Sequence, residues 1–210
     1  MKKLSKMILF IMMISIITIV LCSCGGNTGN LKSTKVTLYG KTYEFPVKGS
    51  ELLDNGWSVP SNISYTKEFQ PQKLTIVGGL KLKHIDGGII GLSSVCNTDT
   101  SPKELNDCFI LGFEINNYEN NMKSFLGDNA VVFPCGITAR SSYDDVVSTF
   151  GEPDDKNEQF KFASAQNGSQ QKTLSYQYQV SSGATFEFSF NNEDNSICGM
   201  KIEAKSPFED

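Results

Sequence analysis

The most regular pattern in the chain is an alternation of apolar and polar residues near its C-terminal end. Residues 174–180, 186–190 and 198–204 each place an apolar side chain at every second position. A period of two is typical of β-strands with one buried and one solvated face. Residues 181–183 and 191–195 are rich in Ser, Gly and Asn and predict the connecting turns. We therefore expect a three-stranded antiparallel meander.

A short helix is predicted just before this meander, over residues 143–150. Ser142 and Asp145 have the spacing of a capping box, in which each side chain bonds to the backbone N–H of the other residue. The apolar residues that follow fall at helical spacing on one stripe: Tyr143, Val146, Val147 and Phe150. Gly151 and Pro153 are typical of the end of a helix. A helix this short is unstable alone, so we expect it to pack on the sheet.

The first half of the chain repeats parts of this plan. Phe45-Pro46 matches Phe133-Pro134, and the segment ILGFEI at 110–115 matches ICGMKI at 197–202. The two matches are spaced 88 and 87 residues apart, which indicates a tandem duplication. Gly112 and Gly199 should then occupy equivalent strand positions, as should the two phenylalanines.

Further elements of the first half follow the same order. Residues 50–55 predict a second short helix, and residues 74–85 and 89–95 predict strands. The sequence predicts an α+β fold with two similar modules, residues 36–117 and 125–204. Each module should be an antiparallel β-meander packed against a short helix.

The motif around residues 136–153 is similar to a signature of small exported bacterial modules. Gly136-Ile137-Thr138 leads into the predicted helix, which ends at Phe150-Gly151-Glu152-Pro153. The segment resembles the outer-membrane lipoproteins of the SmpA/OmlA type and the β-lactamase-inhibitor-protein-like modules. The first half matches only in outline, because it lacks the Gly-x-Pro ending. The resemblance implies a helix-on-sheet fold and a protein-binding rather than catalytic role, and it names no partner.

The N-terminal 23 residues have the pattern of a secretory signal. Lysines at positions 2, 3 and 6 precede an apolar run over residues 7–21, which is shorter than the roughly 20 residues of a membrane-spanning helix. Leu21-Cys22-Ser23-Cys24 then resembles the bacterial lipobox. The resemblance implies cleavage before Cys24 and attachment of diacylglycerol and a palmitate-type acyl chain to Cys24. We expect a protein anchored by lipid on the extracytoplasmic face of a cell membrane, with residues 24–35 as a flexible tether.

The charge of the chain bears on its partners, and its cysteines bear on disulfide formation. The chain has a formal net charge of −4, and removal of the signal would make it more acidic, which argues against nucleic acid as a partner. Export permits disulfides, and the extended runs that end at Cys96 and begin at Cys108 predict a bond between these two residues. The alternative is that all four cysteines after Cys24 are reduced. Cys198 aligns with an inward position and should be a buried thiol, while Cys135 has no assignment.

The sequence offers few residues for catalysis or metal binding. His84 is the single histidine, and no nucleophile motif accompanies it. Asp144-Asp145 are explained by the N-terminus of the predicted helix, and Asp154-Asp155 by an exposed turn. Residues 191–195 resemble only half of a calcium-binding loop. We expect no catalytic residue, metal site or cofactor.

The aromatic stripe of Tyr176, Tyr178, Phe186, Phe188 and Phe190 has two interpretations. It is either the sheet face covered by the helix, or a partly exposed surface on which Tyr176 and Tyr178 bind a partner. The sequence favours a tethered, non-enzymatic module that binds an unidentified envelope or extracellular protein. The alternative is a cell-envelope hydrolase or ligand sensor with a site between the modules.

Overall fold

The computed structural model describes residues 33–65, 67–116, 121–126, 130–162, 170–180 and 182–208. The predicted signal peptide, Cys24 and most of the predicted tether lie outside these residues. In the part of the chain up to residue 116, the elements are β1 (Lys35–Leu38), β2 (Lys41–Glu44), β3 (Val47–Lys48), α2 (Gly49–Leu53), β4 (Trp57–Ser58), β5 (Glu68–Phe69), β6 (Lys73–Ile76), β7 (Lys81–His84), β8 (Ile89–Asn97), β9 (Lys103–Glu104), a 3₁₀ turn (Leu105–Asp107) and β10 (Phe109–Asn116).

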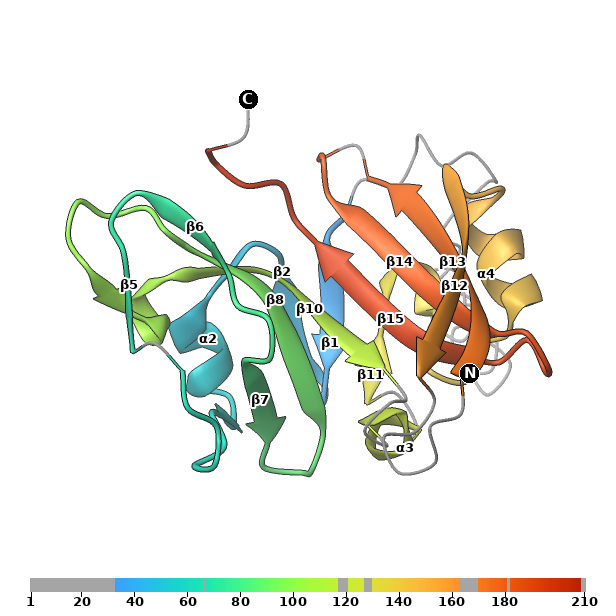
Figure 1. Cartoon of the computed structure of the whole chain (residues 1–210), viewed down its shortest axis with the longest axis horizontal. Coiled ribbons are helices and arrows are strands. Elements are labelled where there is room, and N and C mark those ends of the chain that lie inside the picture. The colour runs from blue at the N-terminus through green and yellow to red at the C-terminus, as the bar shows by residue number, and fades with distance from the viewer. Residues whose placement is uncertain are drawn as a thin grey trace, which may run out of the picture.

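The second part of the chain adds a further helix and strand set. Its elements are α3 (Asn121–Phe125), β11 (Val131–Val132), a 3₁₀ turn (Pro134–Gly136), α4 (Tyr143–Phe150), β12 (Asp155–Phe162), β13 (Gln170–Gln179), β14 (Thr185–Asn191) and β15 (Ile197–Glu203). The protein is thus mainly β with a few short helices (Figure 1).

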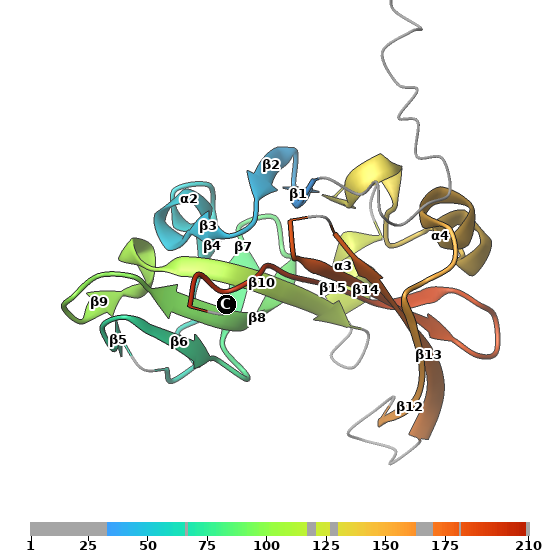
Figure 2. The ribbon, with the colours of Figure 1, turned by 90° about the horizontal axis from the view of Figure 1, so that it is seen from above.

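A large antiparallel sheet organises the described residues. Its strands follow the order β12-β13-β14-β15-β10-β8-β7-β4, with β3 also paired to β10 and β6 also paired to β8. A smaller sheet has the order β11-β1-β2. Helices α2 and α4 and the β1–β2 hairpin lie on the same side of the large sheet (Figure 2). The opposite side carries no helix in this view, and we call it the open face.

Helix α4 forms as its sequence predicts. Ser142 caps the helix and both bonds of the capping box to Asp145 are present, while Gly151 ends the helix with a φ of 81°. The buried side of α4 presents Val146 and Phe150 to the sheet. The Phe150 ring stacks on Phe188 with centroids 5.6 Å apart, so this short helix is held by packing rather than by its own propensity.

The core runs without a break between the helices and the sheet. Phe133 lies near its middle and contacts Phe113, Phe186 and Phe188 with ring centroids 5.3 to 6.2 Å apart. Phe45 packs on Phe113 from the other side at 5.3 Å. Residues from both halves of the sequence therefore share one hydrophobic cluster.

Two sequence predictions about local structure were wrong. The run over residues 74–85 is not one strand but two, β6 and β7, separated by a turn in which Gly79 has a φ of +90°. Asp155 is not in a turn but begins β12, and Asp154 accepts a hydrogen bond from the Gln179 backbone N–H at 2.6 Å. The acidic pair therefore joins the end of α4 to the sheet.

Candidate functional site

The two predicted partner-binding tyrosines lie in the core. Tyr176 and Tyr178 are 2 % and 0 % exposed, so they form no surface for a partner in this structure. The Tyr178 hydroxyl donates to the Gly151 carbonyl at 3.2 Å, and the Tyr176 hydroxyl donates to that of Tyr143 at 2.6 Å. Burial raises the pKa of both phenols. The aromatic stripe is therefore the sheet face that α4 covers, and the open face becomes the candidate site.

One row of directly opposed residues crosses the open face from β6 to β13. It consists of Ile76, Ser94, Gly112, Glu203, Thr185 and Gln179, each paired with the next across neighbouring strands. Directly paired residues in an antiparallel sheet point to the same face. The row therefore has an apolar residue at one end, a carboxylate near its middle and an amide at the other end.

A second row carries most of the charge and lies two residues further along each central strand, or three on β8, where the pairing with β10 is irregular. It consists of Lys81, Gly91, Glu114, Lys201, Glu187, Gln177 and Asp155. Lys201 lies between Glu114 and Glu187, and its Nζ is 3.8 Å from a carboxylate oxygen of Glu203 in the first row. Acidic side chains outnumber basic ones across these two rows.

Small residues let the carboxylates of the open face reach across strands. The Ser94 hydroxyl on β8 donates to Glu203 on β15, although β10 lies between these strands. The position on β10 that separates them is Gly112, which has no side chain to fill the gap. Serine and glycine at these positions thus fix the orientation of the Glu203 side chain.

A second carboxylate on this face is held in the same way. Glu187 accepts a hydrogen bond from the Ser175 hydroxyl at 2.5 Å and another from the Gln177 side chain at 3.4 Å. Ser175 is fully buried at the bottom of the sheet surface, whereas Glu187 is half-buried. Glu203 and Glu187 are therefore positioned by hydrogen bonds rather than left free to rotate.

Ile76 is the exposed apolar residue of the open face. Its side chain is 82 % exposed at the end of the first row. A single exposed apolar residue is ordinary on a protein surface, but one beside oriented polar groups resembles the centre of many protein interfaces. Ile85 is equally exposed at 83 % and lies in the β7–β8 turn, away from this row.

His84 serves the fold in this structure. Its ring is 7 % exposed and stacks on Tyr39 with centroids 4.2 Å apart. The Nε2 atom is 3.2 Å from the Asn55 carbonyl, and Nδ1 accepts the Asp86 backbone N–H at 3.2 Å. This geometry requires the proton on Nε2, so both ring nitrogens hold main-chain groups and tie the β7–β8 turn to the end of α2.

The predicted disulfide between Cys96 and Cys108 is not formed in the structure, where both residues are free thiols. The reason is register, because Cys96 pairs directly with Phe109 and not with Cys108. A shift of one residue points the two side chains to opposite faces of the sheet. Burial is the main cause that raises the pKa of Cys108 to about 11. Cys198 is a buried thiol, as its alignment predicts.

The other polar motifs have structural explanations. Asn191 to Asn195 form a turn in which the Asn191 side chain accepts the Glu193 backbone N–H at 3.0 Å. Hydrogen bonds from Ser196 lower the pKa of Asp194. No cluster of three or more His, Cys, Asp or Glu suited to a metal occurs among the residues that the structure describes. Within that same part of the chain, no helix has the length and apolar character needed to cross a membrane.

Comparisons of this chain with protein-family models, with curated proteins and with solved structures found no match. The assignment of a function therefore depends on the open face itself. Its polar positions were visible in the sequence as the solvated half of each alternating strand. What the sequence did not indicate was that these positions line up across neighbouring strands, because register depends on the pairing of distant segments.

Proposed function

We propose that this protein is a lipid-anchored, extracytoplasmic module that binds another protein through the open face of its sheet, without catalysing a reaction. The observation that carries the proposal is the orientation of two carboxylates in the polar rows of that face. Ser94 orients Glu203 within the first row, and Ser175, which lies next to the second row, orients Glu187. Oriented polar groups beside an exposed apolar side chain favour specific association with a protein surface.

The interpretation as two related modules is part of this proposal. The two halves meet at a seam formed by the paired strands β10 and β15. Each half contains a short helix followed by strands that lead to this seam: α2, β4, β7, β8 and β10 in one half, and α4, β12, β13, β14 and β15 in the other. In both halves a glycine of the last strand faces a serine of the preceding one, Gly112 opposite Ser94 and Gly199 opposite Ser189. These parallels support a duplication in which β10 and β15 are equivalent strands.

Phe45 and Phe133 support the same interpretation. Each directly follows a strand that pairs with β1, β2 in one case and β11 in the other. Both are buried and both contact Phe113, which lies on the seam strand β10. A β-lactamase-inhibitor-protein-like arrangement of two modules would place its binding surface on one continuous sheet, as the open face does.

Membrane attachment is proposed through lipid on Cys24. The expected result is that Cys24→Ala abolishes incorporation of a fatty-acid analogue and releases the protein from the membrane fraction. Cys198→Ala is the matched control, because it removes a buried thiol of the folded part. Lipid labelling that persists in Cys24→Ala would contradict the anchor.

Binding through the open face is tested by site-specific photocrosslinking in intact cells. A photoreactive amino acid replaces Ile76, Thr185 or Gln179 in separate variants, all on the first row of the open face. The control replaces Ile85, which has the same exposure as Ile76 but lies off that row. We expect one common crosslinked partner from the open-face positions and none from the control. Equal crosslinking from Ile85, or none from any open-face position, would refute the proposed surface.

A further inference from the structure

Strand β6 has one edge without a partner among the described residues. It pairs only with β8, in the antiparallel register that joins Lys73 to Asn97 and Ile76 to Ser94. The Val77 backbone N–H donates to the Ser93 carbonyl at 3.2 Å, which continues this register. Antiparallel pairs alternate between bonded and non-bonded, so odd-numbered residues bond to β8. Leu74 and Ile76 therefore turn their N–H and C=O groups outward.

These outward groups make no hydrogen bond to any described residue. Figure 2 shows β6 along the margin of the sheet, beside β8 and on the side away from β10. An exposed strand edge of this kind is a template for pairing with another extended chain. Natural proteins often protect such edges with proline, a bulge or charge, and β6 carries only Lys73 for this purpose.

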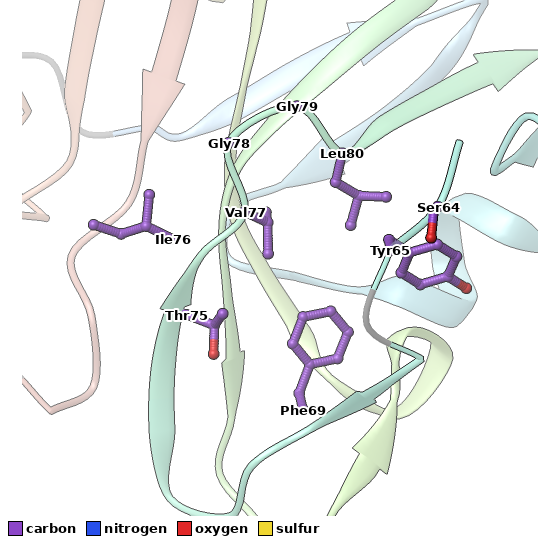
Figure 3. A pocket seen from close by; sticks show the side chains of 9 residues that line it. All are labelled: Ser64, Tyr65, Phe69, Thr75, Ile76, Val77, Gly78, Gly79 and Leu80. Atoms are coloured by element: carbon purple, nitrogen blue, oxygen red, sulfur yellow. The ribbon is translucent and has the colours of Figure 1, made fainter. Parts of the chain in front are cut away.

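A pocket of about 460 Å³ opens next to the same edge. Its walls include Thr75 and Val77 of the β6 region, with Phe69, Tyr65 and Leu80 opposite them (Figure 3). Phe69 and Leu80 are part of the hydrophobic core and form an apolar floor, while Tyr65 and Thr75 add hydroxyls. All of its lining residues fall between Ser64 and Leu80, so the pocket belongs to the first half of the chain and not to the seam between halves.

The edge strand separates two surfaces with different chemistry. Thr75 points toward the pocket, whereas Ile76 points away from it on the other side of β6 (Figure 3). Ile76 pairs with Ser94 and so belongs to the first row of the open face. Lys73 is exposed and, by alternation, lies on the pocket side with Thr75; it forms no ion pair with any described residue.

We propose that an extended segment of a partner protein adds to β6 as a further strand of the sheet and places one apolar side chain in this pocket. The neighbouring side chain of the segment then lies beside Ile76 on the open face. An acidic residue two positions from the pocket-filling residue lies beside Lys73, whose charge it complements. Main-chain hydrogen bonds to Leu74 and Ile76 provide affinity, and the pocket provides selectivity. This inference rests on the proposed function, because it specifies how a partner engages one end of the open face.

The experiment uses the full lipoprotein in detergent and a phage-displayed library of random decapeptides as the probe. Enriched peptides should carry two adjacent apolar residues and an acidic residue two positions from one of them. A synthetic copy of the leading peptide should slow amide exchange at Leu74 and Ile76. N-methylation of the peptide at the alternate amides that face β6 should abolish binding, whereas N-methylation at the other set should not.

Protein variants then test the pocket and the charge. Thr75→Trp fills the pocket and should weaken peptide binding by about tenfold or more. The control is Thr37→Trp, at a half-exposed threonine of β1 in the small sheet, and it should change binding by less than about twofold. Lys73→Glu should weaken the acidic peptide and favour one with lysine at that position. Circular dichroism spectra identical to that of the wild type confirm that each variant folds.

Several results would overturn strand addition at β6. They are no enrichment of any peptide, binding without protection at Leu74 and Ile76, equal loss with both N-methylated sets, or a dimer formed through β6 that excludes the peptide. If these results occur while photocrosslinks from Thr185 and Gln179 persist, only the mode of binding at β6 fails. If those crosslinks are also lost, the open face itself is not the binding surface.

Discussion

Replacement of Gly112 by alanine tests the geometry of the seam between β10 and β15. An added Cβ would overlap the Ile202 carbonyl oxygen of the facing strand and lie only 2.8 Å from the Ser93 hydroxyl and 2.9 Å from Glu203 Cα. The obstacle is backbone rather than the end of a flexible side chain. The two strands must therefore separate along a ladder that extends from Gly112 to Asn116.

The expected loss of stability follows from two contributions. Forcing one extra carbon into a closely packed site costs about 1–3 kcal/mol. Weakening of the hydrogen bond from Ser94 to Glu203, which crosses the Gly112 position, adds about 1 kcal/mol. The entropy gain of replacing glycine in the unfolded chain offsets about 0.4–1 kcal/mol of this. The net free energy of unfolding should therefore fall by about 1–3.5 kcal/mol.

Two other glycines provide graded controls. At Gly199, a Cβ would lie 3.2 Å from the Ser189 Cβ, so Gly199→Ala should cost about 1 kcal/mol. At Gly78, no atom lies within 4 Å of the added carbon and φ is not positive, so Gly78→Ala should leave stability unchanged or slightly raised. From the most to the least stable, the expected order is Gly78→Ala, then Gly199→Ala, then Gly112→Ala.

The assay is equilibrium unfolding in urea, followed by the fluorescence of Trp57. This is the single tryptophan of the chain and is 2 % exposed, so its emission should change on unfolding. With a slope of about 2 kcal/mol per molar urea, Gly112→Ala should lower the midpoint by about 0.5 M or more. A midpoint within about 0.2 M of the wild type, or an equal fall in Gly78→Ala, would show that the seam is not packed as described.

Three further predictions concern groups with defined partners. His84→Ala should lower the free energy of unfolding by about 2 kcal/mol, because a buried ring and its hydrogen bonds are lost. Crosslinking from the open face should be unchanged. Loss of crosslinking with an intact fold would instead favour the hydrolase alternative. Backbone and side-chain bonds from Ser142 lower the pKa of Asp145 in the folded state, so its contribution to stability is present above the unfolded pKa of about 3.9 and is lost as pH falls through the folded value. The difference in urea midpoint between wild type and Asp145→Asn should therefore be largest near neutral pH and vanish in acid, and a difference that is independent of pH would contradict this. Cys96 and Cys108 should resist iodoacetamide at pH 8 in the folded protein, because burial raises the pKa of Cys108 to about 11 and also raises that of Cys96. Both should react once the chain is denatured without reductant. Intact-mass spectra in which neither reacts before reduction would restore the disulfide.

Local signals predicted the second half of the chain well. The capping box and the apolar stripe identified α4, whose hydrogen bonds at Ser142 and Asp145 are formed as expected. Alternation identified β13, β14 and β15, which pair antiparallel with each other. These features depend on residues close in the sequence, so the chain itself contains the information.

Features that depend on distant partners were harder to predict. Strand β12 begins with the polar sequence DKNE and has no apolar alternation there; it forms because its residues pair along β13 from Asp155 opposite Gln177 onward. The small sheet β11-β1-β2 joins strands on either side of a long sequence separation. Cys96 and Cys108 were expected to be opposite each other, but their pairing is shifted by one residue, which the sequence pattern does not specify.

The candidate site illustrates the same division. Alternation separated an aromatic face from a polar face in β13 and β14, and only the position of α4 showed which face was covered. The binding role predicted for Tyr176 and Tyr178 was therefore on the wrong side of the sheet. The polar side chains next to them in sequence, such as Gln177 and Glu187, are the ones that the structure leaves accessible.

The composition of the open face fits its proposed role as a specific binding surface. Serine and glycine in the strand centres keep the face shallow, so that Glu203 can reach Ser94 across β10. Charged residues above them oppose nonspecific association of two such faces, because acidic groups predominate on both. In the proposed interface, the exposed apolar contact would be at Ile76, where the first row meets the free edge of β6. An interface that begins at this edge would first gain main-chain hydrogen bonds and then extend along the first row. The register of the strands would therefore set the orientation of the partner on the sheet.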